Sequence, residues 1–259
     1  MLAGLLVTAL LLQQPAPAPS AADDDYVRDA FIRRLDYVIF HQPIDDENVE
    51  RVARLLQPGD ILDLQSQGGT VRASLRFGEL VMDRVIRVRV TGECASGCSL
   101  VWAVARDRLD NGFVGATFHG TPISAWTWAS ENPEYFSAAE LTLIENENAV
   151  FRDFLAKAGL QPWLFECAYR LQNIRQNPVL NPAPGQPRFR PEGDYTRVWF
   201  PAGILTQAGV RGLDRYDPPN PRQRLSIETG NGTRPTPLPV YWASDGDCDP
   251  DIAAAGQGS

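Results

Sequence analysis

Short apolar runs alternate with amphipathic segments over the first half of the chain. The run YVIF at residues 37–40 has the pattern of a strand, and the apolar residues of 44–56 then recur every three or four positions, which predicts a helix. The same unit recurs along the chain, with strands predicted at 60–65, 87–92 and 113–118 and helices at 71–84 and 99–108. This alternation predicts an α/β fold whose strands pair in parallel through right-handed crossovers.

Between residues 121 and 193 the chain has mainly helical patterns. Ser137 and Glu140 have the spacing of a capping box, which predicts a helix over 137–158. Further elements are predicted as a lead-in helix at 26–34, a helix at 161–176, a strand at 196–200 and a helix at 201–210. We expect a signal peptide at 1–22, one domain at 23–212 and an irregular Pro/Gly-rich tail at 213–259.

The N-terminus has the layout of a secretory signal. An apolar run over residues 2–12 is followed by Pro and Ala and then by the small residues Ser20 and Ala22. No Lys or Arg precedes this run, so retention as an N-terminal anchor is the alternative to cleavage after Ala22. We therefore expect an exported protein, periplasmic or secreted.

Composition narrows the function classes. The chain has 259 residues, a formal net charge of -8 and 44% hydrophobic residues, which is ordinary for a globular protein. The sequence has no cluster of positive charge of the kind that binds nucleic acid. We therefore expect no nucleic-acid partner.

The four cysteines fit an oxidising compartment. An even number in an exported chain predicts two disulfides, and four cysteines allow three pairings. The candidates are Cys94, Cys98, Cys167 and Cys248. No histidine lies close to them in the sequence, so we expect no metal site. A cysteine nucleophile is the alternative, because the N-terminus of a helix lowers the pKa of a thiol.

The stretch GECASGCSL at residues 92–100 places Ser96 between a predicted strand and a predicted helix. Backbone amides and the positive end of a helix dipole stabilise developing negative charge at such a junction. The amide of Gly97 is therefore a candidate oxyanion-hole donor, and Gly68 and Gly69 at the next strand end are candidates for the second. His119 follows the strand after Ser96, so both should emerge at the same sheet edge, where His119 could act as a base.

These residues, in this order, resemble the Clp protease proteolytic subunit and the ClpP/crotonase superfamily. The resemblance covers residues 37–121, and it is strongest to exported ClpP-like proteins with a C-x-S-x-C centre. It implies a ClpP/crotonase-like spiral of repeated β-β-α units with a helical insertion. It also implies that Ser96 is the nucleophile, that His119 is the general base and that the amides of Gly69 and Gly97 form the oxyanion hole.

The third catalytic residue departs from the family pattern. The family carries an aspartate where this chain has Val198, and Asp194 is the nearest substitute. A serine-lysine dyad, as in the signal peptide peptidase branch, would need Lys157, the only lysine in the chain. We assign His41, which precedes a proline, to structure.

Two functions follow from these observations, and we carry both. The first is an exported serine hydrolase of the peptidase type that acts on a peptide or flexible protein segment, without a cofactor and without a cytosolic ATPase partner. The second is a catalytically inactive ClpP-like binding or assembly module. Acyl-CoA chemistry, as in crotonases, is a third alternative that would not need Ser96. The resemblance implies a homo-oligomer in each case.

Overall fold

The structure is a computed structural model, and it describes residues 33–34, 37–109, 115–119, 121–172, 175–178, 189–192, 196–214, 216–229, 239–249 and 251–252. The expected signal peptide and Asp194 lie outside these residues, as does most of the expected lead-in helix. Residues 33 and 34 at the end of that segment form a strand, not a helix.

A mostly parallel sheet forms the centre of the fold. Its strands are β1 (Arg33–Arg34), β2 (Tyr37–Phe40), β3 (Ile61–Ser66), β4 (Arg87–Ala95) and β5 (Asp107–Arg108), paired in that order, while β6 (Gly115–Thr117) pairs with the far end of β4. The β1–β2 pair is antiparallel and the other pairs are parallel. The α/β fold with a parallel sheet, predicted from the alternating pattern, is therefore confirmed.

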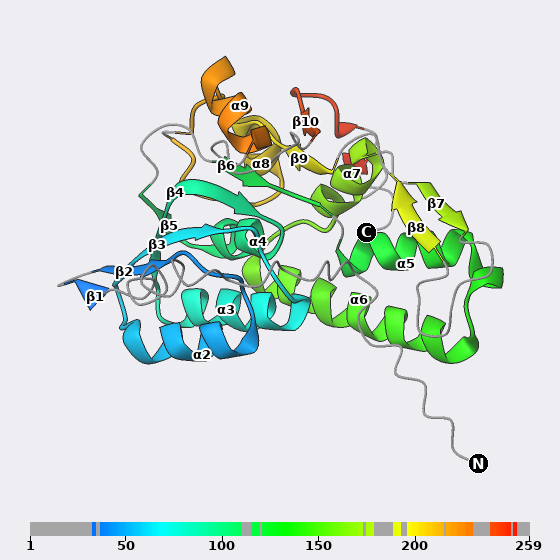
Figure 1. The fold of residues 1–259 in the computed structure, drawn as a ribbon, viewed down its shortest axis with the longest axis horizontal. Helices are drawn as coiled ribbons and strands as arrows, with labels where there is room; N and C mark the ends of the chain where they lie inside the picture. The colour runs from blue at the N-terminus through cyan, green and yellow to red at the C-terminus, as the bar shows by residue number, and fades with distance from the viewer. Residues whose placement is uncertain are drawn as a thin grey trace, which may run out of the picture.

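Three helices follow the strands β2, β3 and β4; the third was predicted to run to residue 108, but it ends at Val104, and residues 107 and 108 form β5 instead. These helices are α2 (Asp46–Leu55), α3 (Val71–Asp83) and α4 (Gly97–Val104). Asp45 and Thr70 cap the first two by accepting hydrogen bonds from the backbone of the first helical turn. Figure 1 shows α2 and α3 side by side along the strands, and α3 packs on both α2 and α4.

The helical insertion lies beside the sheet (Figure 1). It contains α5 (Pro122–Glu131), the 3-10 helix η1 (Pro133–Tyr135), α6 (Ala138–Ala158) and α7 (Trp163–Gln172). Ser137 and Glu140 form the predicted capping box, and Gly159, with φ of 75°, ends α6 in the left-handed conformation. No helix in the described residues combines the length and the apolar character that crossing a bilayer requires.

The C-terminal part of the chain contains more regular structure than the sequence pattern indicates. After the short antiparallel pair β7 (Arg175–Pro178) and β8 (Phe189–Glu192) come β9 (Arg197–Trp199), α8 (Ala202–Gln207), α9 (Pro221–Thr229) and β10 (Val240–Trp242). The expectation of an irregular tail beyond residue 213 is therefore corrected at α9 and β10. The strand β10 pairs in parallel with β9, and its short apolar run VYW was hidden by the surrounding Pro and Gly.

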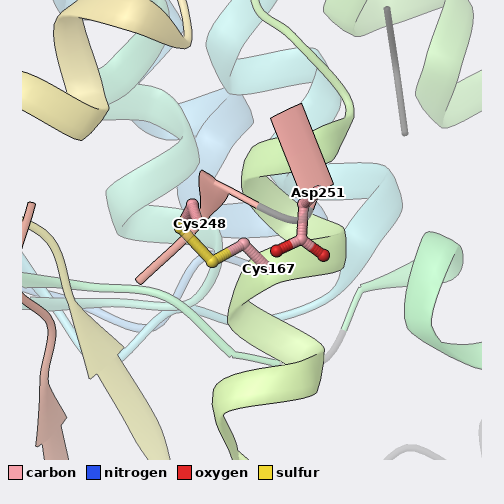
Figure 2. A group of neighbouring side chains, drawn as sticks. All are labelled: Cys167, Cys248 and Asp251. Atoms are coloured by element: carbon pink, nitrogen blue, oxygen red, sulfur yellow. A yellow bond between two sulfur atoms is a disulfide. The ribbon is translucent and has the colours of Figure 1, made fainter. Parts of the chain in front are cut away.

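A disulfide ties this C-terminal part to the helical insertion. Cys248 is bonded to Cys167 of α7, and both residues are fully buried. Figure 2 shows the bond with Asp251 beside it. The Sγ atoms and a carboxylate oxygen of this group lie within 4.8 Å of one another. Sulfurs bonded to each other are not thiolate ligands, and Asp251 pairs with Arg170 at 2.7 Å, so the group is a crosslink beside an ion pair.

Candidate active site

Ser96 occupies a strained turn between β4 and α4. Its backbone has φ of 58° and ψ of -124°, a conformation that non-glycine residues rarely adopt. It stands at the N-cap of α4, where the backbone is usually extended and the side chain caps the helix. The Ser96 hydroxyl makes no capping hydrogen bond. The side chain of Ser96 therefore does not cap α4, and the turn has the geometry of a nucleophile elbow.

The elbow is anchored to strand β6 by its backbone. The amide of Ser96 donates to the carbonyl of Thr117 at 3.1 Å, and the hydroxyl of Ser99 donates to the carbonyls of Ser96 at 2.7 Å and Thr117 at 2.9 Å. Because Thr117 is two residues before His119, these bonds fix the position of the serine turn relative to the histidine.

A disulfide spans the elbow. Cys94 and Cys98 stand two residues before and two residues after Ser96, are fully buried and are bonded to each other. With Cys167–Cys248, this decides among the three pairings that the sequence allowed. It also leaves no free thiol among the described residues, so the alternative of a cysteine nucleophile is not supported. Two disulfides are compatible with an oxidising environment.

Gly68 and Gly69 bring the end of β3 against the serine turn. The amide of Ile44 donates to the carbonyl of Gly68 at 2.9 Å, and the carbonyl of Ile44 accepts from the amide of Thr70 at 3.0 Å. A Cβ on Gly69 would lie 1.9 Å from the Ile44 carbonyl oxygen, and one on Gly68 would lie 2.6 Å from the Cβ of Ser96. Both positions therefore require glycine, because no side chain fits between the backbones.

Two backbone amides are left free beside Ser96. The Ile44 pairing does not use the amide of Gly69, and Gly97 is the first residue of α4, where helix amides have no partner within the helix. Within the described part of the chain, neither amide donates a hydrogen bond to another residue. The nitrogen of Gly69 lies 3.7 Å from where a Cβ on Gly97 would stand, so the two donors are close together.

His119 and Ser96 line one small cavity, together with Gly69 and Gly97. The structure therefore brings the four predicted site residues to the same place. His119 follows β6, and the next residue back, Phe118, bridges Val198 of β9 through two backbone hydrogen bonds of 2.8 Å. Position 198, where the family resemblance implies an aspartate, is a fully buried valine, so β9 offers no carboxylate there.

The environment of His119 favours the neutral imidazole. Burial, assisted by the positive charge of Arg197, lowers the pKa of His119 to about 4. The guanidinium of Arg197 pairs with the carboxylate of Glu93 on β4, and both side chains are about nine-tenths buried. Among the described residues, no carboxylate forms an ion pair or a hydrogen bond with His119. The assignment of Asp194 as the third catalytic residue stays a prediction.

Lys157 and His41 lie outside the cavity. Lys157 pairs with Glu79 at 3.6 Å on the surface, where about half of each side chain is exposed, and it does not line the cavity. A serine-lysine dyad is therefore not supported. His41 stands 3.5 Å from the carboxylate of Asp63, which also accepts a hydrogen bond from Thr91 at 2.7 Å. This agrees with a structural role for His41.

Sequence reasoning missed the Glu93–Arg197 pair and the apolar part of the cavity. Arg197 stands next to buried Val198 in a three-residue strand whose members are all buried, and a charged residue in such a strand is the signal that could have indicated a buried ion pair. Phe151 lies within the helix predicted over 137–158, but its place in the cavity depends on how α6 packs against α3, α5 and α7.

Comparison with known proteins finds only distant likenesses of structure. No protein-family model matches the sequence, and no curated protein matches it. Among solved structures, ClpP1 from Listeria monocytogenes is 16% identical with a TM-score of 0.34, over 52% of this chain and 76% of that chain. A point mutant of the same Listeria protein is 15% identical with a TM-score of 0.32, over 53% of this chain and 77% of that chain.

Proposed function

We propose that this protein is a serine hydrolase that cleaves an acyl carbonyl compound, such as a peptide, through an acyl-enzyme at Ser96. The observation that carries the proposal is the elbow. Its non-glycine residue is held at φ of 58°, makes no capping bond and stands beside two free amides. Such strain persists only where surrounding structure enforces it, and it is concentrated at functional sites.

The proposed chemistry uses the four predicted site residues that line the cavity. Oγ of Ser96 attacks the carbonyl carbon while neutral His119 accepts the hydroxyl proton, and the amides of Gly69 and Gly97 donate to the oxyanion. His119 then gives the proton to the leaving group, which departs as the carbonyl reforms. His119 next takes a proton from a water molecule, which attacks the acyl carbon. The carboxylic acid leaves as His119 returns the proton to Oγ of Ser96. The two disulfides favour an oxidising location, and we propose that the protein acts after export.

The alternative is a binding module without catalysis, and it is favoured by the finding that no carboxylate among the described residues forms an ion pair or a hydrogen bond with His119. A histidine without an orienting carboxylate is a weaker catalytic base, and removal of this group can cost orders of magnitude in rate. The two functions differ in one observable property, the reactivity of the Ser96 hydroxyl.

Labelling with a fluorophosphonate tests the proposal directly. The oxidised wild type should be labelled at Ser96, and both Ser96→Ala and His119→Gln should abolish the labelling. His41→Gln is the matched control, because it changes the other histidine of the chain at a position outside the cavity. Absence of labelling in folded, oxidised wild type would favour the binding module.

A further inference from the structure

The cavity beside Ser96 is small and mainly apolar at its closed end. Its volume is about 30 Å³. Ser96 and His119 are partly exposed and lie at the open side. The large lining residues with exposure of 4% or less are Leu100, Phe118, Phe151 and Phe165, and we define these four as the closed end.

The aromatic rings of the closed end pack against one another. Phe165 packs edge-on against Phe118 at 5.9 Å and against Phe151 at 5.2 Å between ring centroids. Phe151 comes from α6 of the insertion and Phe165 from α7, and α7 is fixed by the Cys167–Cys248 disulfide. Enlarging the cavity would require displacing these helices, so the cavity sets a limit on the size of a bound group.

The volume of the cavity restricts a chemical group that binds in it to a few atoms. A cavity must offer roughly 10–15 Å³ to hold one water molecule, and an engineered apolar cavity of about 150 Å³ binds benzene. A cavity of about 30 Å³ accommodates a methyl or ethyl group and excludes a ring or a branched chain.

The position of the cavity identifies which part of the substrate enters it. The leaving group receives its proton from His119 and must depart, so it belongs on the open side. The group attached to the carbonyl carbon then points to the closed end. We propose that Phe151 and Phe165 restrict the hydrolase to acyl groups that place no more than a methyl or ethyl group in the cavity, such as acetyl, propionyl or an alanyl residue through its side-chain methyl. This inference rests on the proposed function.

A chain-length series tests the size limit. Intact mass spectrometry would follow acylation of Ser96 by p-nitrophenyl acetate, butyrate and octanoate, with Ser96→Ala as background. In each reaction the Ser96 oxygen gains the acyl group, p-nitrophenol leaves with the proton, and water later releases the acid. Wild type should react at least about tenfold faster with acetate than with octanoate, because one surplus methylene in a filled apolar pocket costs about that factor or more.

A matched pair of variants locates the limit in the structure. Phe151→Val should reduce the preference for acetate over octanoate by at least about tenfold. Phe154→Val removes the same atoms from the same helix, but Phe154 packs on Gly78 and does not line the cavity, so its preference should equal that of wild type. If Phe151→Val fails to fold by circular dichroism, Leu100→Ala replaces it, with the same expectation.

The outcomes separate the two proposals. Acylation of wild type that is as fast with octanoate as with acetate would overturn the size limit and leave the hydrolase intact. An equal change of preference in Phe151→Val and Phe154→Val would also overturn it. If neither an ester nor a fluorophosphonate modifies Ser96, the proposed function fails, and the size limit fails with it.

Discussion

The rate at which a fluorophosphonate labels Ser96 should fall at acid pH as His119 becomes protonated, so its pH dependence reports on the environment of His119. Burial and the charge of Arg197 hold the pKa of His119 at about 4, against an ordinary value near 6.5. At pH 5 about 90% of such a residue is neutral and able to accept a proton, whereas about 3% of an ordinary histidine is. We therefore expect labelling of Ser96 at pH 5 to run close to its plateau rate, with a midpoint near pH 4.

Two variants change the charge beside His119 in opposite directions. Glu93→Gln removes one negative charge beside Arg197 and should move the midpoint further down. The double variant Glu93→Gln/Arg197→Met removes both charges and should move it up, to a value still below 6.5 because burial remains. Removing one member of a buried ion pair destabilises a protein by about 3–5 kcal/mol, so Arg197 is replaced only together with Glu93, and the folding of Glu93→Gln is checked by circular dichroism.

The assay is the rate of fluorophosphonate labelling between pH 3.5 and 8 at constant ionic strength. Stability gives a second measure of the same pKa. The unfolded chain binds a proton at His119 near pH 6.5 and the folded chain only near 4, so the free energy of unfolding should fall by about 3 kcal/mol as the pH falls through this window. A wild-type midpoint at 6.5 or above, or an unchanged midpoint in both variants, would refute the reasoning.

Three further results are expected. Gly97→Ala should reduce labelling at least about a hundredfold by displacing an oxyanion donor, because its Cβ would stand 1.9 Å from the Oγ of Ser74, and recovery in Gly97→Ala/Ser74→Gly would confirm the steric cause. Replacing Cys94 and Cys98 together by Ala should lower the free energy of unfolding by about 2 kcal/mol in denaturant titration and slow labelling, because loss of the crosslink frees the elbow. Hydrogen bonds to Asp63 outweigh burial and hold its pKa at about 2, so Asp63→Asn should remove about 2 kcal/mol of stability at pH 7 and leave the labelling rate unchanged; equal stability of variant and wild type at pH 7 would count against this.

Local patterns were sufficient to predict the strands β2, β3, β4 and β6 and the helices beside them, but β1 and β5 fall in segments that were predicted as helix. The helices α2, α3 and α6 were predicted because each has an amphipathic period or a capping signal within its own residues. The strand β10 was missed for the opposite reason. It is three residues long and is stabilised by pairing with β9, more than forty positions earlier in the sequence, so its own residues carry almost no signal.

The site was predicted only as far as the backbone determines it. Ser96, Gly97, Gly69 and His119 stand at the ends of parallel strands or at the start of the helix that follows, and the topology alone brings such positions to one edge. The charge beside His119 and the size of the cavity depend on side chains from β9, α6 and α7. How these elements pack is a long-range property, and a single sequence does not reveal it.

The Cys167–Cys248 bond changes the mechanical connectivity of the molecule. It closes a covalent ring over a sequence separation of 81 residues, which includes β9, α8 and β10. A force that pulls the two termini apart would be transmitted through the disulfide, so the residues between Cys167 and Cys248 would not be extended. At about 3.5 Å per extended residue, the oxidised chain in an optical trap should stop about 280 Å short of the reduced chain. A protease that cuts within the ring would likewise release no fragment until the bond is reduced.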